Sequence, residues 1–206
     1  MIQIYGRDNS VNVQKVMWCA DELGLPFERH DVGGAFGGTH DATYLAMNPN
    51  AKIPTLVDGD CVLWESNSII RYLSAKYGDG ILWPREPAVR GRADRWMDWQ
   101  LTSLAVGMTS VFWGWVRTPP ENRDVPALVK TARELAEVWR LLDTHLAASP
   151  YIGGDHFSMG DIPAGALSFR WHQLPIDRPD LPHLFRWYQQ LQERPAFRTR
   201  IMQPMR

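Results

Sequence analysis

Two short stretches of the chain carry residue types that could bind a small peptide. Asn50 opens a run in which Ile53 directly precedes Pro54, and Ser66 follows at the expected start of a helix. Proline lacks an N–H and fixes its φ, so the backbone of Ile53 is free to pair with a partner outside its own sheet. An extended peptide could dock there as an added strand.

The helix expected to begin at Ser66 would supply the second half of such a site. The first N–H groups of a helix have no partners within it and carry partial positive charge, which favours a bound carboxylate. The spacing of the two stretches therefore predicts a cradle for a small peptide with a free carboxylate.

The elements that would position these residues alternate between strand and helix. The patterns predict strands over 2–5, 27–32, 55–57 and 61–64, and helices over 11–23, 41–47 and 66–77. Gly24 and Pro26 end the first helix, because glycine suits the left-handed cap and proline bars continuation. We expect a mixed α/β domain of order β-α-β-α-β-β-α over residues 1–78.

No strand pattern follows a linker expected at 79–88. Helices are predicted over 89–115, 128–146, 159–171, 181–192 and 195–202. The second of these has an apolar stripe along one face. Ser158 and Asp161 form the acidic variant of a capping box before the third. We expect an all-helical domain over residues 89–206.

Composition excludes several classes of function. The formal net charge of -1 and pI near 6.6 provide no basic field to recruit nucleic acid or an anionic membrane. The start of the chain has no apolar signal region, and no apolar run is long enough to cross a membrane, so we expect a cytoplasmic protein. Cys19 and Cys61 are too few for a disulfide scaffold, and no metal site is readable.

Three features, in this order and at this spacing, resemble the cytosolic glutathione S-transferases. They are Asn48-Pro-Asn-Ala-Lys-Ile-Pro-Thr-Leu, the pair Glu65-Ser66, and the segment Gly153-Gly-Asp-His-Phe-Ser-Met-Gly-Asp. The resemblance covers nearly the whole chain. It implies a thioredoxin-like N-terminal domain that holds glutathione and a helical C-terminal domain that holds an electrophile. It also implies a homodimeric detoxification enzyme that conjugates glutathione, its co-substrate, to small hydrophobic electrophiles without a separate cofactor.

The resemblance also assigns roles in binding glutathione. Pro54 would be the family's cis-proline, so that Ile53 pairs with the cysteinyl unit. Ser66 would bind the γ-glutamyl carboxylate and Glu65 its ammonium. For the glycyl carboxylate the candidates are Lys52 and His40, and we favour Lys52 because it directly precedes the binding strand.

The reacting sulfur needs a donor, since only the thiolate attacks well and a free thiol is mostly protonated at neutral pH. Ser10 precedes the first helix, as in the serine-using, theta-like transferases, and a hydroxyl there would stabilise the thiolate together with the helix dipole. Asn12 could share this role, as in the nu-like bacterial transferases. Tyr5 remains the alternative, as in the tyrosine-using classes.

The second substrate is expected to meet an apolar wall on the long helix. Met108, Phe112 and Trp115 recur there at i, i+4 and i+7, although core packing explains the same spacing. Asp98 on this helix could reach a partner's glutathione across a dimer interface, or be an ordinary solvated aspartate. Two other functions stay open: glutathione-dependent disulfide or peroxide reduction or isomerisation, and a non-catalytic binding or regulatory role.

Overall fold

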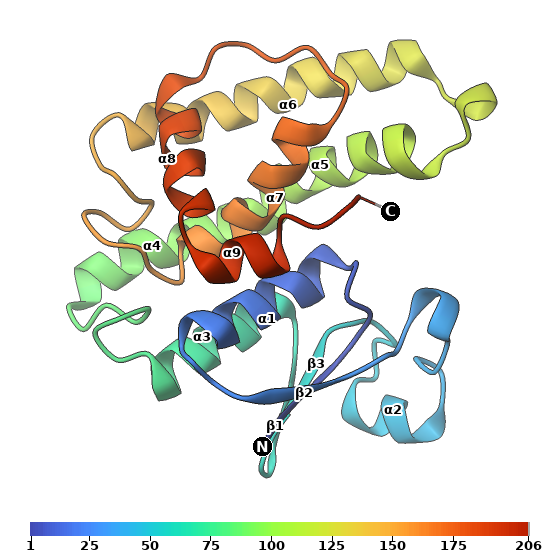
Figure 1. Ribbon diagram of the computed structural model, residues 1–206, viewed down its shortest axis with the longest axis vertical. Coiled ribbons are helices and arrows are strands. Elements are labelled where there is room, and N and C mark those ends of the chain that lie inside the picture. Colours follow the sequence, from blue (N-terminus) through green and yellow to red (C-terminus); the bar gives the residue numbers. More distant parts are fainter. Residues whose placement is uncertain (206) are drawn as a thin grey trace.

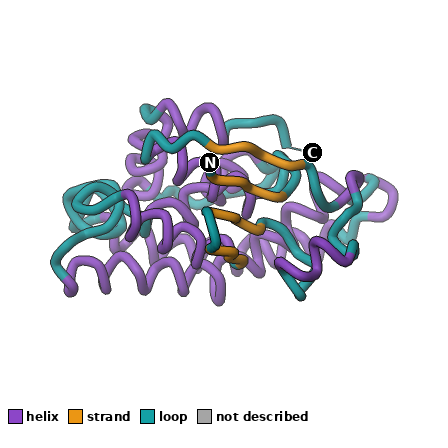
Figure 2. The backbone as a smooth tube through the Cα atoms, turned by 90° about the horizontal axis from the view of Figure 1, so that it is seen from below, coloured by secondary structure: helices purple, strands orange, loops and turns teal. Residues whose placement is uncertain are grey.

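The N-terminal half of the protein is a four-stranded sheet with helices packed beside it. The computed structural model describes residues 1–205 (Figure 1). The elements are β1 (Ile2–Tyr5), α1 (Val11–Glu22), β2 (Phe27–His30), η1 (Gly34–Phe36), α2 (Ala42–Met47), β3 (Thr55–Asp58), β4 (Cys61–Trp64) and α3 (Ser66–Tyr77). The sheet order is β2-β1-β3-β4, with β1 parallel to β2 and antiparallel to β3. Figure 2 shows these strands as a ladder surrounded by helices.

The C-terminal half is helical throughout the part of the chain described. It consists of α4 (Pro87–Trp99), η2 (Gln100–Leu104), α5 (Ala105–Phe112), η3 (Trp113–Arg117), η4 (Pro120–Asn122), α6 (Val125–Leu146), α7 (Asp161–Gln173), α8 (Pro182–Gln192) and α9 (Pro195–Arg200). Together the two halves confirm the expected fold class, a thioredoxin-like domain followed by an all-helical domain. The domain boundaries at 78 and 89 stay predictions; α3 ends at Tyr77 and α4 begins at Pro87.

The long helix expected over 89–115 is interrupted twice. Segments η2 and η3 are π-helical, so the backbone is locally wound more loosely there than in α4 and α5. Gln100 of η2 is buried against the N-terminal domain, and Arg117 ends η3 beside the loop that precedes α1. Both interruptions therefore occur where the long helix meets the other half of the protein.

Helix α1 joins the two halves. Its residues from Val13 to Ala20 are all buried, and it packs against α3 on one side and against α7 and α9 on the other. Ion pairs of Glu22 with Arg194 and of Asp21 with Arg200 tie its C-terminal end to the helical domain. Because Ser10 directly precedes α1, these contacts fix where that serine lies relative to α5 and α7.

The start of helix α7 contains the predicted capping box of Ser158 and Asp161, but the hydrogen bond of the serine hydroxyl differs from the expected one. Asp161 accepts hydrogen bonds from the backbone N–H of Ser158 and of Ile152 and from Trp187 Nε1, each at 2.9 Å. The Ser158 hydroxyl, however, accepts from the N–H of Gly160 rather than from the third helical amide. The buried aspartate thus holds together the start of α7, the preceding loop and α8.

Among the described residues, none of the helices has the length and apolar character needed to cross a membrane.

Candidate functional site

The loop before β3 presents the backbone of Ile53 to a cavity. The Ile53–Pro54 peptide bond is cis. The Lys52 carbonyl accepts hydrogen bonds of 2.7 Å from both Asn48 Nδ2 and the Tyr44 hydroxyl. The loop is therefore held by side chains, while Ile53 itself lines the cavity.

The start of α3 forms the opposite wall of this cavity. Glu65, the residue before the helix, has a φ of 70°, a left-handed conformation that non-glycine residues seldom adopt. Such a backbone costs on the order of 1–3 kcal/mol and is often found where a functional group must be aimed. Here it aims the Glu65 side chain and the buried Ser66 at the same space.

Most of the residues expected to bind glutathione meet in this cavity of about 180 Å³. It is lined by Asn12, Asn48, Asn50, Lys52, Ile53, Pro54, Trp64, Glu65 and Ser66. His40 lies elsewhere, exposed in the turn before α2, so the structure brings Lys52 but not His40 to the cavity. Its polar side chains and free helix start suit a short zwitterionic peptide.

Ser10 lies at the N-terminus of α1 and lines a second cavity of about 180 Å³. Its side chain makes no capping hydrogen bond to the described first turn, although its carbonyl accepts from Gln14 N–H. Asn12 lines both cavities, and its Oδ1 accepts a hydrogen bond of 3.4 Å from the Ser66 hydroxyl. A sulfur placed between the two cavities would thus lie near Ser10, Asn12 and the N-terminus of α1.

The other candidates for holding the sulfur are engaged elsewhere. The Tyr5 hydroxyl donates to Gln3 Oε1 at 2.8 Å, and its ring stacks on His30. Cys19 is buried, and burial raises the pKa of its thiol to about 12. That thiol therefore stays protonated at neutral pH and is not suited to act as a nucleophile.

A buried lysine supports the start of α3 from behind. Lys15 Nζ donates to Ser66 Oγ and Asn67 Oδ1 at 3.4 Å and to Gln100 Oε1 at 3.3 Å. Burial lowers the pKa of Lys15 to about 7, while the Glu65 carboxylate opposes that shift. The lysine thus places an amine that is charged below about pH 7 under Ser66 and links it to η2. This role of Lys15 was not predicted from the sequence, although a lysine within the apolar run of the first helix is a signal of a buried charged group.

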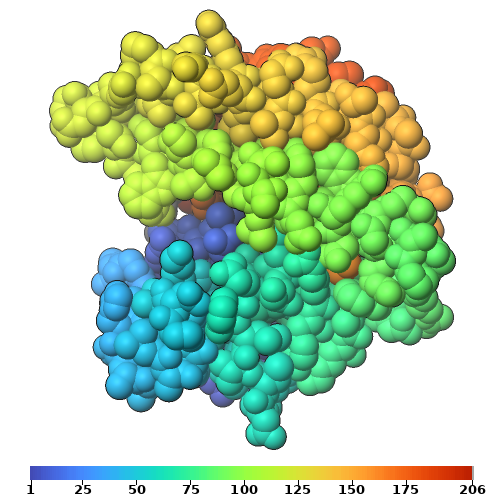
Figure 3. Space-filling view, turned by 180° about the vertical axis from the view of Figure 1, so that it is seen from behind, coloured from blue at the N-terminus to red at the C-terminus, as the bar shows by residue number. Residues whose placement is uncertain are grey.

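The cavity beside Ser10 differs from the expected apolar wall. Phe112 lines it, with Trp113 and Thr109 of the same helical region, whereas Met108 is buried in the core and Trp115 does not reach it. Its other lining residues include three arginines, at positions 7, 117 and 170. Figure 3 shows a hollow here, between the yellow-green segment around residues 110–120 and the blue N-terminal domain. The arginines were not singled out because they lie far apart in the sequence.

Asp98 is paired within the chain. Its carboxylate and that of Asp94 both accept from the Arg71 guanidinium, which bridges α4 to α3. The described residues hold no cluster of three or more histidine, cysteine or acidic side chains that could bind a metal.

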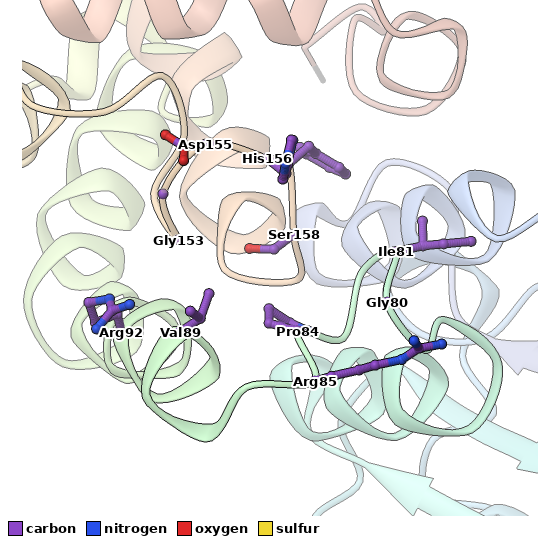
Figure 4. Close-up of a pocket in the computed structure, with 12 residues that line it drawn as sticks. Gly80, Ile81, Pro84, Arg85, Val89, Arg92, Gly153, Asp155, His156 and Ser158 are labelled. Atoms are coloured by element: carbon purple, nitrogen blue, oxygen red, sulfur yellow. The ribbon is translucent and has the colours of Figure 1, made fainter.

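A larger cavity of about 530 Å³ lies apart from these groups (Figure 4). It is bounded by the linker from Gly80 to Arg85, by α4, and by the loop that holds Asp155 and His156. None of the residues expected to bind glutathione lines it, so its size does not make it the site of the chemistry.

The fold and the two adjoining cavities define a thioredoxin-like protein with a cavity suited to a small peptide beside a helical domain. Comparison with known proteins agrees. Residues 4–82 match the family described as "Glutathione S-transferase, N-terminal domain", and residues 127–190 match "Glutathione S-transferase, C-terminal domain".

Individual relatives extend over the whole chain. The Escherichia coli K12 protein named Glutathione S-transferase GstB is 44% identical, with 100% of each chain covered. Glutathione S-transferase 3 of Zea mays is 30% identical and covers 97% of this chain and 93% of its own. A crystal structure of a theta class glutathione S-transferase from Xanthomonas axonopodis pv. citri, with glutathione bound, superposes with a TM-score of 0.96 at 46% identity, covering 100% and 99%. The chain belongs to the glutathione S-transferase family and is an enzyme of the transferase class.

Proposed function

We propose that Ser10 holds the sulfur of glutathione as the thiolate and presents it to a small electrophile in the neighbouring cavity. The observation that supports this most directly is the Ser10 side chain, which lies at the start of α1 without a capping hydrogen bond to the described first turn. A hydroxyl in that position is available to donate to sulfur. Asn12, between the two cavities, is placed to help.

Glutathione would lie across the first cavity in one direction. Ile53 pairs with the cysteinyl backbone, Ser66 and the α3 N-terminus take the γ-glutamyl carboxylate, and Glu65 takes its ammonium. Lys52 then faces the glycyl carboxylate at the other end. The cysteinyl unit would lie between the two ends, and its sulfur would point past Asn12, which lines both cavities, toward Ser10.

The proposed reaction depends on stabilising the negative charge of the thiolate more than on a general base. A hydrogen bond to a charged group contributes roughly 1.5–3 kcal/mol, and about 1.4 kcal/mol shifts a pKa by one unit. The hydroxyl and the α1 dipole together therefore suffice to hold thiolate at neutral pH. The sulfur attacks the electrophilic carbon, the S–C bond forms, and the leaving group departs with its electron pair while the thiol proton passes to solvent.

The thiolate assignment is tested by ultraviolet titration of bound glutathione. Ser10→Ala should raise the pKa of the bound thiol by about one to two units and lower kcat for 1-chloro-2,4-dinitrobenzene by roughly tenfold or more. Tyr5→Phe is the control, since its hydroxyl bonds to Gln3. An unchanged thiol pKa in Ser10→Ala, or loss of activity only in Tyr5→Phe, would overturn the assignment.

We also propose that the protein is a cytoplasmic homodimer. Support comes from α3 and α4, which Arg71 joins through ion pairs with Asp94 and Asp98, and from the part-exposed side chain of Leu101, three residues after Asp98. An exposed apolar side chain close to charged groups is common at interface surfaces.

A further inference from the structure

The second cavity is lined by guanidinium groups that come from three separate elements. Arg7 follows β1, Arg117 ends η3, and Arg170 lies on α7. Ser10 and Asn12 line the same cavity. Positive charge is therefore gathered from both halves of the protein at the place where the sulfur of glutathione is proposed to react.

The aromatic wall of this cavity is covered by two of these groups. The Arg170 guanidinium lies 4.0 Å from the centre of the Phe112 ring, and that of Arg117 lies 5.5 Å from the same ring. Arg117 is also 4.9 Å from the ring of Trp113. Cation–π contact thus fixes the guanidinium groups against the rings. An incoming electrophile meets charge as well as apolar surface.

Several arginines elsewhere in the protein are paired with carboxylates, and Arg7 and Arg170 differ from them in their hydrogen bonds. Arg71, Arg194 and Arg200 bind aspartate or glutamate at the contacts between elements. In contrast, the hydrogen bonds given for Arg170 and Arg7 end on neutral oxygens of Asn9, both at 3.4 Å. These bonds are long and do not balance the charge.

The pKa values of Arg170 and Arg7 are consistent with a cluster of like charges in this cavity. Burial lowers the pKa of Arg170 to about 10, and the positive charges of Arg117 and Arg7 add to the effect. The pKa of Arg7 is lowered by burial and by Arg117. Arg170 nevertheless stays charged at neutral pH. A half-buried cation with cationic neighbours is stabilised by a bound anion.

We propose that the second substrate carries a carboxylate, which Arg170 and Arg7 bind in this cavity, with Arg117 adding to the field. This inference rests on the proposed function and specifies the substrate class of the same site, in place of the purely hydrophobic electrophile expected from sequence. The planar fork of arginine suits a carboxylate in two-point contact. The anchored electrophile would then present its reactive carbon to the sulfur at Ser10.

The proposal is tested with two aryl chlorides of the same size and different charge, 4-chloro-3,5-dinitrobenzoate and its carboxamide. In both, the sulfur attacks the ring carbon that bears chlorine, the S–C bond forms, and chloride leaves with the bonding electrons. Each enzymatic kcat/KM is divided by the rate constant of the uncatalysed reaction with glutathione. The ratio of the two corrected values then reports recognition of the charge alone.

In the wild type this ratio should favour the benzoate by roughly tenfold or more, as a charge-assisted contact predicts, and should fall with added salt. Arg170→Gln and Arg7→Gln should each move the ratio toward one. Arg133→Gln is the matched control, because Arg133 is exposed on α6. If Arg170→Gln does not fold, Arg7→Gln and the wild-type salt series still test the idea.

The outcomes separate the two proposals. Equal corrected rates for benzoate and carboxamide in the wild type would overturn the carboxylate site while leaving the glutathione site intact. A changed thiol pKa with an unchanged ratio in the arginine variants would mean that the arginines serve the sulfur, which also overturns it. Failure to bind glutathione, by contrast, would refute the proposed function itself.

Discussion

The ammonium of Lys15 shows how one residue couples stability to the site. It is fully buried and donates only to neutral oxygens, those of Ser66, Asn67 and Gln100. Burying a charge without a directly bonded carboxylate is costly, and proteins often respond by lowering the pKa of the group. Lys15 therefore supports the start of α3 at some cost to the stability of the fold.

This cost predicts a pH dependence. The pKa of Lys15 is about 7 in the folded protein and about 10.4 in an unfolded chain, so the unfolded state binds more protons between these values. The contribution of this group to the unfolding free energy therefore increases as pH rises from 7 toward 10, and is lost as pH falls to 7. In Lys15→Met this increase should be absent.

Urea unfolding at pH 7, 8 and 9 measures the effect as a difference between wild type and variant. Lys130→Met provides the control, because Lys130 is exposed on α6. If wild type and Lys15→Met lose or gain stability in parallel over this range, Lys15 does not titrate there.

Lys15 and Pro54 together show which parts of the candidate site can be predicted from the amino-acid sequence and which cannot. The stretch around Ile53, Pro54 and Ser66 is local and was recognisable, since its chemistry depends on residues close in sequence. Lys15 acts on Ser66 from 51 positions away, and Arg170 reaches the loop of Asn9 from 161 positions away. Only the packing of α1 against α3 and α7 brings these groups together.

At the scale of elements, the start of α7 depends on one carboxylate. Asp161 accepts from two backbone N–H groups and from Trp187, and burial raises its pKa to about 6 in spite of these bonds. Asp161→Ala would leave several buried donors unpaired, at about 1–3 kcal/mol each, so we expect a loss of about 3 kcal/mol or more. Asp161→Asn should lose less, because one oxygen remains to accept.

Denaturant unfolding of the two variants measures these losses. Asp155→Asn is a control in the same loop, where the side chain is exposed. A loss in Asp161→Ala no greater than that in Asp155→Asn would show that the buried network contributes little.

The long helix from Pro87 to Arg117 illustrates where prediction from the sequence stopped. Apolar periodicity indicated its extent, since core contacts repeat with the helical turn. Periodicity does not show a local change of winding, so the π-helical segments at Gln100 and Trp113 were not expected. Gln100 of the first segment accepts hydrogen bonds from Lys15 and Asn67 of the N-terminal domain, and Arg117 of the second lines the cavity beside Ser10.

At the scale of the whole molecule, the cavity beside Ser10 exists only because the two domains keep a fixed relative position. Its lining comes from the loop before α1, from α5 and η3, and from α7. The ion pairs of Glu22 and Asp21 on α1 with Arg194 and Arg200 anchor that relation. Weakening these ion pairs should therefore alter the cavity beside Ser10 more than the cavity at Ile53 and Ser66, whose lining lies within the N-terminal domain.

The proposed dimer makes a prediction at the same scale. Leu101 and Val129 are both 39% exposed, but Leu101 of η2 lies three residues after Asp98, which pairs with Arg71 of α3, whereas Val129 lies on α6. Leu101→Glu buries a charge only if that face is an interface, and should therefore shift the mass measured by light scattering from dimer toward monomer. Val129→Glu should remain dimeric. Because association stabilises the folded chain by mass action, the Tm of the wild type should also rise with protein concentration, and that of Leu101→Glu should not. A wild type that is monomeric at every concentration, or equal masses for both variants, would contradict this interface.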